Sequence, residues 1–320
     1  LVLSDAVPEP ARDKALERAG FALPGRAYVN LRSLAGTGAR REQFVALAVL
    51  ACDMLAHKPD PDMALNNWER FVSCLASPGD HFALLRSQPM RLDILLSIFA
   101  GSQFLADTLI ANPEFFDWVT TPRNLQRMRD REELDAELRD VNARSATRRD
   151  WQNALRRLRR REILRIGTRD MWLNVPVKEI TREISLVAEA FTQAALARCW
   201  REACTHLPAA ATLEQHFCIF AFGKLGGGEL NYSSDIDLLG MYDDVSLRAA
   251  VDAAVFASAP DTYAKLIEGL RADLADHTEE GYAYRVDFRL RPFGSSGELV
   301  TSLTELQRYY LHEASLWEVQ

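Results

Sequence analysis

The stretch FCIFAFGKLGGGELNYSSDIDLL, residues 217–239, decides the fold of the C-terminal part of the chain. Six apolar residues run without a break to Gly223, and a short apolar run that stops at glycine is typical of a buried strand. Three consecutive glycines follow, and apolar residues resume at Ile236. We therefore predict one strand at 217–222, a glycine-rich turn, and a second strand at 234–242.

The second predicted strand carries two carboxylates. Alternate residues of a strand share a face, so Asp235 and Asp237 are expected to point to the same side. Their repulsion is about 4 kcal/mol at about 4 Å with an effective dielectric near 20, and a divalent cation between them would turn that cost into binding. An isolated Asp-x-Asp is common on exposed strands without any function. The glycine turn just upstream favours a site here, because glycines let backbone N–H groups approach a phosphate.

A third aspartate lies in the alternating segment 284–291. Its apolar positions form one face, and the other face carries Asp287 among three arginines, Arg285, Arg289 and Arg291. By itself, this pattern favours an ion-paired surface strand. Beside the strand of Asp235 and Asp237, the same pattern predicts a third metal ligand flanked by guanidinium groups suited to phosphates. We predict this strand at 282–291.

The chain before residue 200 has a different spacing of apolar residues. From residue 42 onward, apolar residues recur at intervals of three and four, which predicts amphipathic helices packed on one another. The clearest apolar stripes run from Phe44 to Leu55 and from Leu65 to Leu75. Further helices are expected at 91–100, 102–111, 131–141, 151–171 and 178–200, and helices between the later strands at 249–276. We predict an α+β, predominantly helical fold, with a helical bundle domain at 1–212 and a catalytic domain with a small mixed sheet at 213–320.

An arginine-rich run at 156–161 precedes Glu162. It could contact phosphate or RNA, or it could form a solvated helix face with ion pairs. Apolar residues cross the run at helical spacing, at Leu155, Leu158, Ile163 and Leu164, and this favours the solvated face.

Composition excludes several classes of protein. A formal net charge of -7 and a pI near 5.5 argue against a general nucleic-acid binder. No apolar run is long enough to cross a bilayer, and the first residues lack a secretory pattern, so we expect no membrane partner and a cytoplasmic location. The five cysteines lack paired spacing, which predicts reduced, mostly packed side chains without a disulfide or zinc site.

A glycine pair, then Asp-x-Asp on a strand, then a later aspartate resembles the arrangement of the DNA polymerase beta nucleotidyltransferase superfamily. The resemblance implies a polymerase-beta-type catalytic domain with two Mg²⁺ ions. Asp235 and Asp237 would bridge the ions, and Asp287 would complete the shell of one of them.

Longer motifs narrow the resemblance to one family. Residues 222–238 and 285–294, with the helical segments 59–67, 102–107 and 161–166, resemble bacterial glutamine synthetase adenylyltransferase. The family has two halves, one that adenylylates a tyrosine of glutamine synthetase and one that removes AMP by phosphorolysis, giving ADP. The residues at 231–237 and 291–294 resemble the motifs of the N-terminal, adenylyl-removing half more than those of the other half.

The resemblance also implies a set of binding residues and partners. Asp235, Asp237 and Asp287 would be the catalytic metal ligands. ATP or ADP and phosphate would be bound by Gly226 and Gly227 of the turn, with Ser234 adjacent, and by the basic residues Lys224, Arg289 and Arg291. Glutamine synthetase is the expected protein substrate, and a PII-type signalling protein is a further candidate partner.

Several readings stay open from the sequence. Residues 316–320 end inside a segment that continues in the family, so we expect the catalytic domain to extend beyond this chain. ATP-dependent adenylylation of glutamine synthetase uses the same metal chemistry and is an alternative. Transfer to another acceptor is a second alternative. A non-catalytic nucleotide-binding regulatory module is a third, and the intact set of three aspartates argues against it.

Overall fold

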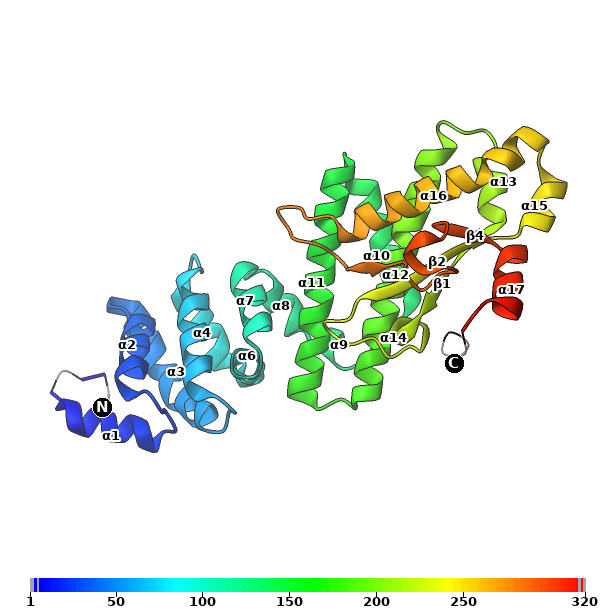
Figure 1. The fold of residues 1–320 in the computed structure, drawn as a ribbon. Helices are drawn as coiled ribbons and strands as arrows, with labels where there is room; N and C mark the ends of the chain where they lie inside the picture. The colour runs from blue at the N-terminus through cyan, green and yellow to red at the C-terminus, as the bar shows by residue number, and fades with distance from the viewer. Residues whose placement is uncertain (1–2, 5, 316–317, 319–320) are drawn as a thin grey trace. The chain divides into compact units, whose positions relative to one another are not determined.

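The computed structural model describes residues 3–4, 6–315 and 318 (Figure 1). The expectation for the chain end at 316–320 therefore lies outside the described residues, except at Glu318. The described chain is predominantly helical with one small mixed sheet, which confirms the α+β fold class. Its contacts form two compact units, Leu1–Met128 with Arg160–Val177, and Arg129–Arg159 with Lys178–Gln320. The boundary expected at residue 212 does not coincide with this division.

The first unit consists of helices. Pro or Asp begins many of them, as at α4, where Asp60 accepts a hydrogen bond from the Met63 N–H at 2.8 Å. Among the residues described, no helix combines the length and apolar character needed to cross a membrane. The helices are α1 Glu9–Arg18, α2 Pro24–Ala35, α3 Gly38–Ala56, α4 Pro61–Ser73, α5 Pro78–Ser87, α6 Pro89–Gly101, α7 Gln103–Ala111, α8 Phe115–Val119, α9 Pro122–Leu125 and residues 160–173 of α11 Arg148–Leu173.

The core of the first unit lies between the apolar stripes of these helices. The stripes predicted from Phe44 on α3 and from Leu65 on α4 are buried. Phe44, Trp68 and Phe82 pack ring against ring, with centroids 5.2–6.1 Å apart. The three-and-four periodicity therefore identified helix faces correctly.

The second unit combines helices with the sheet. Its elements are residues 148–159 of α11, α10 Arg131–Arg144, α12 Val177–Cys204, α13 Ala210–Gln215, β1 Phe217–Phe222, α14 Gly223–Gly226, β2 Ile236–Tyr242, α15 Asp244–Ala250, α16 Ala253–Ala275, β3 Val286–Asp287, the 3-10 turn η1 Gly294–Ser296, β4 Val300–Ser302 and α17 Leu303–His312.

β2 is the central strand of the sheet. β1 pairs antiparallel along one edge of β2, while β3 and β4 pair parallel with the opposite edge. α16 packs on the sheet beside β3 and β4 (Figure 1). A Cβ at Gly240 of β2 would lie 3.0 Å from the Ile267 side chain of α16, so glycine permits this close packing.

The predicted third strand is much shorter than the sequence suggested. Residues 282–291 were expected to be extended, but only Val286 and Asp287 pair with β2. Beyond β3 the chain turns, because the Arg291 guanidinium donates to the carbonyls of Phe288 and Gly297 at 2.9 and 3.2 Å. The predicted second strand likewise begins at Ile236 and not at 234.

The arginine run at 156–161 is not a solvated face, because Arg156 is 1% exposed and the other arginines of the run are only partly exposed. The solvated-face interpretation was therefore wrong, although Arg157 and Arg161 do form ion pairs.

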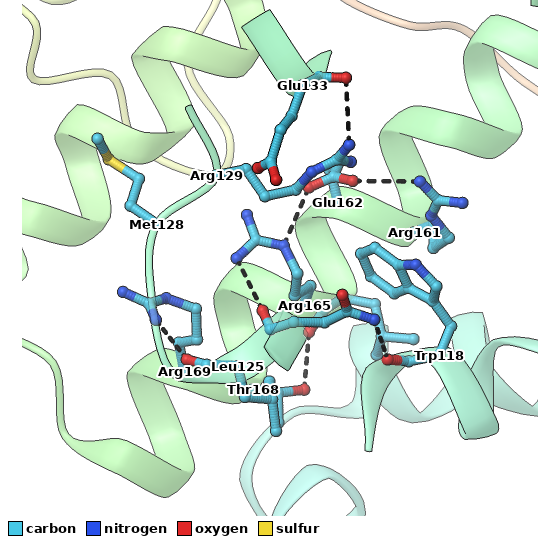
Figure 2. A network of polar contacts seen from close by, with 12 residues as sticks. Trp118, Leu125, Met128, Arg129, Glu133, Arg161, Glu162, Arg165, Thr168 and Arg169 are labelled. Carbon is cyan, nitrogen blue, oxygen red and sulfur yellow. Dashed lines mark hydrogen bonds and ion pairs between the residues drawn. The ribbon is translucent and has the colours of Figure 1, made fainter. Parts of the chain in front are cut away.

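Buried arginines continue along α11 beyond the run. In the first unit, Arg165 and Glu162 are completely buried and form an ion pair at 3.0 Å (Figure 2). Arg165 and Arg169 also donate to the carbonyls of Asn124 and Leu125. Burial of these arginines is compensated because each one satisfies carbonyls that the α9 segment leaves open.

The first half of α11 holds the segment that leads to β3. Arg156 is 1% exposed and donates to the carbonyls of Gly281 and Asp273 at 2.7 and 3.2 Å. The guanidinium of Arg159 lies 4.5 Å from the ring centre of Tyr284, two residues before β3. These buried arginines thus fix where Asp287 enters the sheet.

Candidate active site

The glycine-rich turn follows β1 without a break and has little steric freedom. Gly223 has φ +55°, and a Cβ there would lie 2.7 Å from the Asp237 Oδ2. A Cβ at Gly226 would lie 2.4 Å from the carbonyl oxygen of Ala221. Leu225 and Leu230 anchor the turn in the core, and the Leu230 N–H donates to the Ser185 hydroxyl of α12 at 2.9 Å. The turn is therefore a packed element beside Asp237.

Several backbone N–H groups of the turn form hydrogen bonds to carbonyls of the same turn. The N–H groups of Gly227, Gly228 and Glu229 donate to carbonyls of residues 223–225 at 2.8–3.0 Å. Residues Gly223–Gly226 form a single helical turn, α14, which the sequence did not predict. In this conformation the Gly227 N–H is already hydrogen bonded, while Lys224 and Gly226 are exposed.

Asp235 lies in the loop between the turn and β2. The Ser234 hydroxyl donates to the Asn231 side-chain oxygen at 2.6 Å and so holds this loop. The carboxylate of Asp235 accepts a hydrogen bond from the Arg285 guanidinium, which also donates to the Ser233 carbonyl at 2.8 Å. Both side chains of this ion pair are about half exposed, 46% for Asp235 and 57% for Arg285.

Asp237 and Asp287 lie opposite each other on neighbouring strands. They are register partners in the parallel pair of β2 and β3, and Phe222 is the partner of Asp237 on β1. Partial burial raises the pKa of Asp237, and the negative charges of Asp287 and Asp235 raise it further. Among the described residues the Asp237 carboxylate has no ion pair or hydrogen bond. It is thus a negative charge without a direct counter-charge.

Asp287 has the opposite electrostatic environment. Its carboxylate accepts hydrogen bonds from the Arg289 guanidinium at 2.8 and 3.0 Å and from the Arg289 backbone N–H at 2.8 Å. These hydrogen bonds hold the pKa of Asp287 below its usual range. The Arg289 side chain is 78% exposed, and its charge also interacts with Asp237 and Asp235. Arg289 is therefore an exposed positive charge that acts on all three aspartates.

The family relationship follows from comparison with known proteins. The sequence model of one family, glutamate-ammonia ligase adenylyltransferase, matches residues 92–320. The chain belongs to this adenylyltransferase family. The match covers the turn, all three aspartates and their arginine neighbours.

Curated relatives extend the match into the first unit. A bifunctional glutamine synthetase adenylyltransferase/adenylyl-removing enzyme of Methylococcus capsulatus is 32% identical over 92% of this chain and 32% of its own length. Proteins with the same name from Thioalkalivibrio sulfidiphilus and Chromobacterium violaceum are 31% and 28% identical over 90% and 98% of this chain. The chain spans about a third of the length of these relatives.

The donors of this candidate site fit divalent cations by their chemistry. In the described part of the chain, no three acidic, histidine or cysteine side chains are placed to hold a metal ion. Asp235 and Asp287 are turned to Arg285 and Arg289. Three carboxylates are nevertheless the hard oxygen ligands that Mg²⁺ prefers, and Asp237 has no direct counter-charge. A cation would be held by Asp235, Asp237 and Asp287. Arg285 and Arg289 would first have to break their ion pairs with Asp235 and Asp287.

Two cavities of the sheet-containing unit share Arg289 in their lining. One of about 470 Å³ extends from Asp287 to Arg271 of α16. The other, of about 370 Å³, has an aromatic lining that includes Phe222, Phe293 and Tyr309. Phe293 is held at φ 62°, a left-handed conformation that is costly for a bulky side chain, and it is 47% exposed. Such strain in an exposed aromatic residue points to a role for the ring.

Sequence reasoning did not find these aromatic residues. Phe222 and Phe293 were quoted only as parts of longer motifs, since neither alternation nor spacing distinguishes a cavity wall from a core residue. The proline before Phe293 and the glycine after it mark a turn, which was the available signal. The Arg291 guanidinium donates to loop carbonyls and also lines both cavities, so its role in phosphate binding stays a prediction.

Proposed function

We propose that this chain is a nucleotidyltransferase that removes AMP from an adenylylated tyrosine of glutamine synthetase. Inorganic phosphate would be the acceptor and ADP the product. The observation that supports this most is the uncompensated Asp237 carboxylate opposite Asp287, with Arg289 above them. The relatives are named for both adenylylation and adenylyl removal on glutamine synthetase, and this supports the same substrate.

The reaction balances without an oxidant or a second nucleotide. A phosphate oxygen attacks the phosphorus of the AMP group and forms a new P–O bond. The bond between that phosphorus and the tyrosyl oxygen breaks, and the tyrosyl oxygen takes up a proton. The products are ADP and unmodified tyrosine, so the site must hold two anionic phosphorus groups close together.

The residues of this chain suit that task. Asp235, Asp237 and Asp287 would hold two Mg²⁺ ions, which supply charge neutralisation and orientation when bound. Arg289 would then be released from Asp287, and its exposed guanidinium is suited to the attacking phosphate. Lys224 is exposed on the turn next to this site. The glycines of the turn would let the backbone approach the phosphate, and the absence of a side chain at Gly223 leaves room for the Asp237 carboxylate.

The aromatic cavity supplies a place for the base. Adenine is a flat ring that stacks on aromatic side chains, and Phe222, Phe293 and Tyr309 line a cavity that also includes Arg289. The phosphate end of the nucleotide would then lie at Arg289 and the base beside Phe293. A PII-type signalling protein remains a candidate partner of this function.

The test uses the purified chain in two parallel reactions with Mg²⁺. One contains inorganic phosphate and adenylylated glutamine synthetase, and the other contains ATP and the unmodified enzyme. We expect phosphate-dependent release of ADP in the first. Asp261→Asn serves as the matched control for Asp237→Asn, because Asp261 is an exposed aspartate of α16.

Each outcome decides a different part of the proposal. ADP release that disappears in Asp237→Asn and persists in Asp261→Asn supports both the direction and the site. Transfer of AMP from ATP without phosphorolysis overturns the direction and keeps the site. No reaction in either mixture, with a folded chain, overturns nucleotidyl transfer by this chain.

A further inference from the structure

A further cavity of the sheet-containing unit lies among helices, outside the candidate active site. Its volume is about 780 Å³, within the range of small-molecule sites. Its wall comes from α10, α11, α12 and α16 and from the loop that follows α12. None of the three aspartates of the candidate site lines it. We call it the basic cavity.

Cationic side chains dominate the wall of the basic cavity. Arg148, Arg198, Arg201 and Lys265 line it, and Glu202 is the single acidic side chain of the lining. Arg148 and Arg198 share Glu202 at 3.5 and 3.3 Å. Arg201 and Lys265 are exposed and have no ion pair among the described residues. The cavity is therefore positive in a chain whose net charge is -7.

The hydrogen-bonding capacity of this wall is incompletely used. The Nε of Arg198 is buried and has no hydrogen-bond partner among the described atoms, although it lies 3.3 Å from Glu202. The angle there does not suit a hydrogen bond. The same guanidinium donates to the Asn142 side-chain oxygen at 3.2 Å, so Arg198 is held in the wall as a fixed positive charge.

The rest of the wall is mixed: Asn142, Thr205, His206 and Thr262 are polar, and the remaining lining residues are apolar. Leu207, Leu266 and the buried Cys199 contribute to the apolar part. At Gly269 a Cβ would lie 3.3 Å from the Cys199 sulfur, so the glycine permits close packing of α16 against α12 here. An occupant needs an apolar body for this surface and an anionic group for the arginines.

We propose that the basic cavity binds a small organic anion, a molecule with a carboxylate or phosphate group on an apolar body. Arg198, Arg201 and Lys265 would bind the anionic group, and Leu266 and Leu207 would contact the body. The cavity is joined to the candidate active site by α16. Lys265 and Leu266 line the basic cavity, and Ile267 and Arg271 on the same helix line the cavity beside Asp287.

The test is calorimetric titration of the chain with naphthyl phosphate and with naphthoate, and neutral naphthol is the control ligand. We expect saturable binding of one molecule for at least one of the two anions and none for naphthol. Low ionic strength keeps the charge interactions from being screened. Arg201→Glu and Lys265→Glu should each weaken binding by about tenfold or more, since each reverses a charge at the cavity.

Two further variants locate the binding. Arg182→Glu is the matched control for Arg201→Glu, because Arg182 is also an exposed arginine of α12 and does not line the cavity. Its affinity should equal that of the wild type. Arg289→Gln should also leave this binding unchanged. Binding of neither anion, equal binding of naphthol, or binding lost in Arg289→Gln and kept in Arg201→Glu would each overturn the proposal.

Discussion

Asp237→Asn should make the protein more stable and inactive at the same time. The substitution keeps the shape of the side chain and removes its charge, which has no direct partner in the described structure. Register partners on adjacent strands have backbones about 4.8 Å apart. Two carboxylates about 5 Å apart repel by about 3 kcal/mol at an effective dielectric near 20.

The expected gain is smaller than this repulsion. Arg289 neutralises much of the Asp287 charge, and water reaches the site. We therefore expect Asp237→Asn to raise the free energy of unfolding by about 1 kcal/mol, equivalent to about 2–4 °C in Tm. The sign depends on pH. The folded-state pKa of Asp237 is raised, so its ionisation destabilises the fold as pH rises through that pKa. The gain should be present at neutral pH and vanish as pH falls toward 3.8, the ordinary aspartate pKa.

The assay is thermal unfolding without metal and with increasing Mg²⁺, together with turnover. Mg²⁺ at a hundred times its Kd should stabilise the wild type by about 2.7 kcal/mol, and should have much less effect on Asp237→Asn. Turnover should fall by about a hundredfold or more. A variant that is less stable than the wild type without metal, or that retains a near-normal rate in Mg²⁺, would refute the electrostatic reasoning.

Three other substitutions test separate features of the structure. Gly226→Ala places a methyl group 2.4 Å from the Ala221 carbonyl, so denaturant titration should show a loss of about 1–3 kcal/mol; no loss would contradict the tight packing of the turn. Burial, and then the charge of Arg91, lowers the pKa of His81 to about 4. The wild type should therefore lose up to about 3 kcal/mol of stability as pH falls from 6.5 to 4, and His81→Leu should lose less; parallel pH profiles would contradict this. Phe293→Asn keeps a residue that tolerates positive φ and removes the ring, so KM for nucleotide should rise while Tm holds, and an unchanged KM would exclude base stacking.

The helices show which features local pattern can predict. The segments expected at 91–100, 131–141 and 178–200 are α6, α10 and α12, with ends that differ by a few residues. Helix caps and apolar spacing depend on residues that are close in the sequence, so the sequence alone can predict them. The helices α1 and α17, of ten residues each, were not predicted.

The candidate site was predictable to a similar degree. The sequence placed two aspartates at the start of one strand and a third on another, and β2 and β3 bring Asp237 and Asp287 opposite each other. The roles of these residues in metal binding and catalysis stay predictions. The sequence could not show that Arg285 and Arg289 pair with Asp235 and Asp287, because that depends on side-chain rotamers in the assembled sheet.

The sequence by itself determined the helical character, the strand at 217–222, the second strand except for its exact start, and the family motifs. Only the tertiary structure decided which charged residues are buried. Arg156 looked like a surface arginine, yet it is buried because it donates to the carbonyl of Gly281, which lies 125 residues further along the chain. A charge can leave water only where partners replace its hydration, and the three-dimensional fold supplies those partners from distant segments.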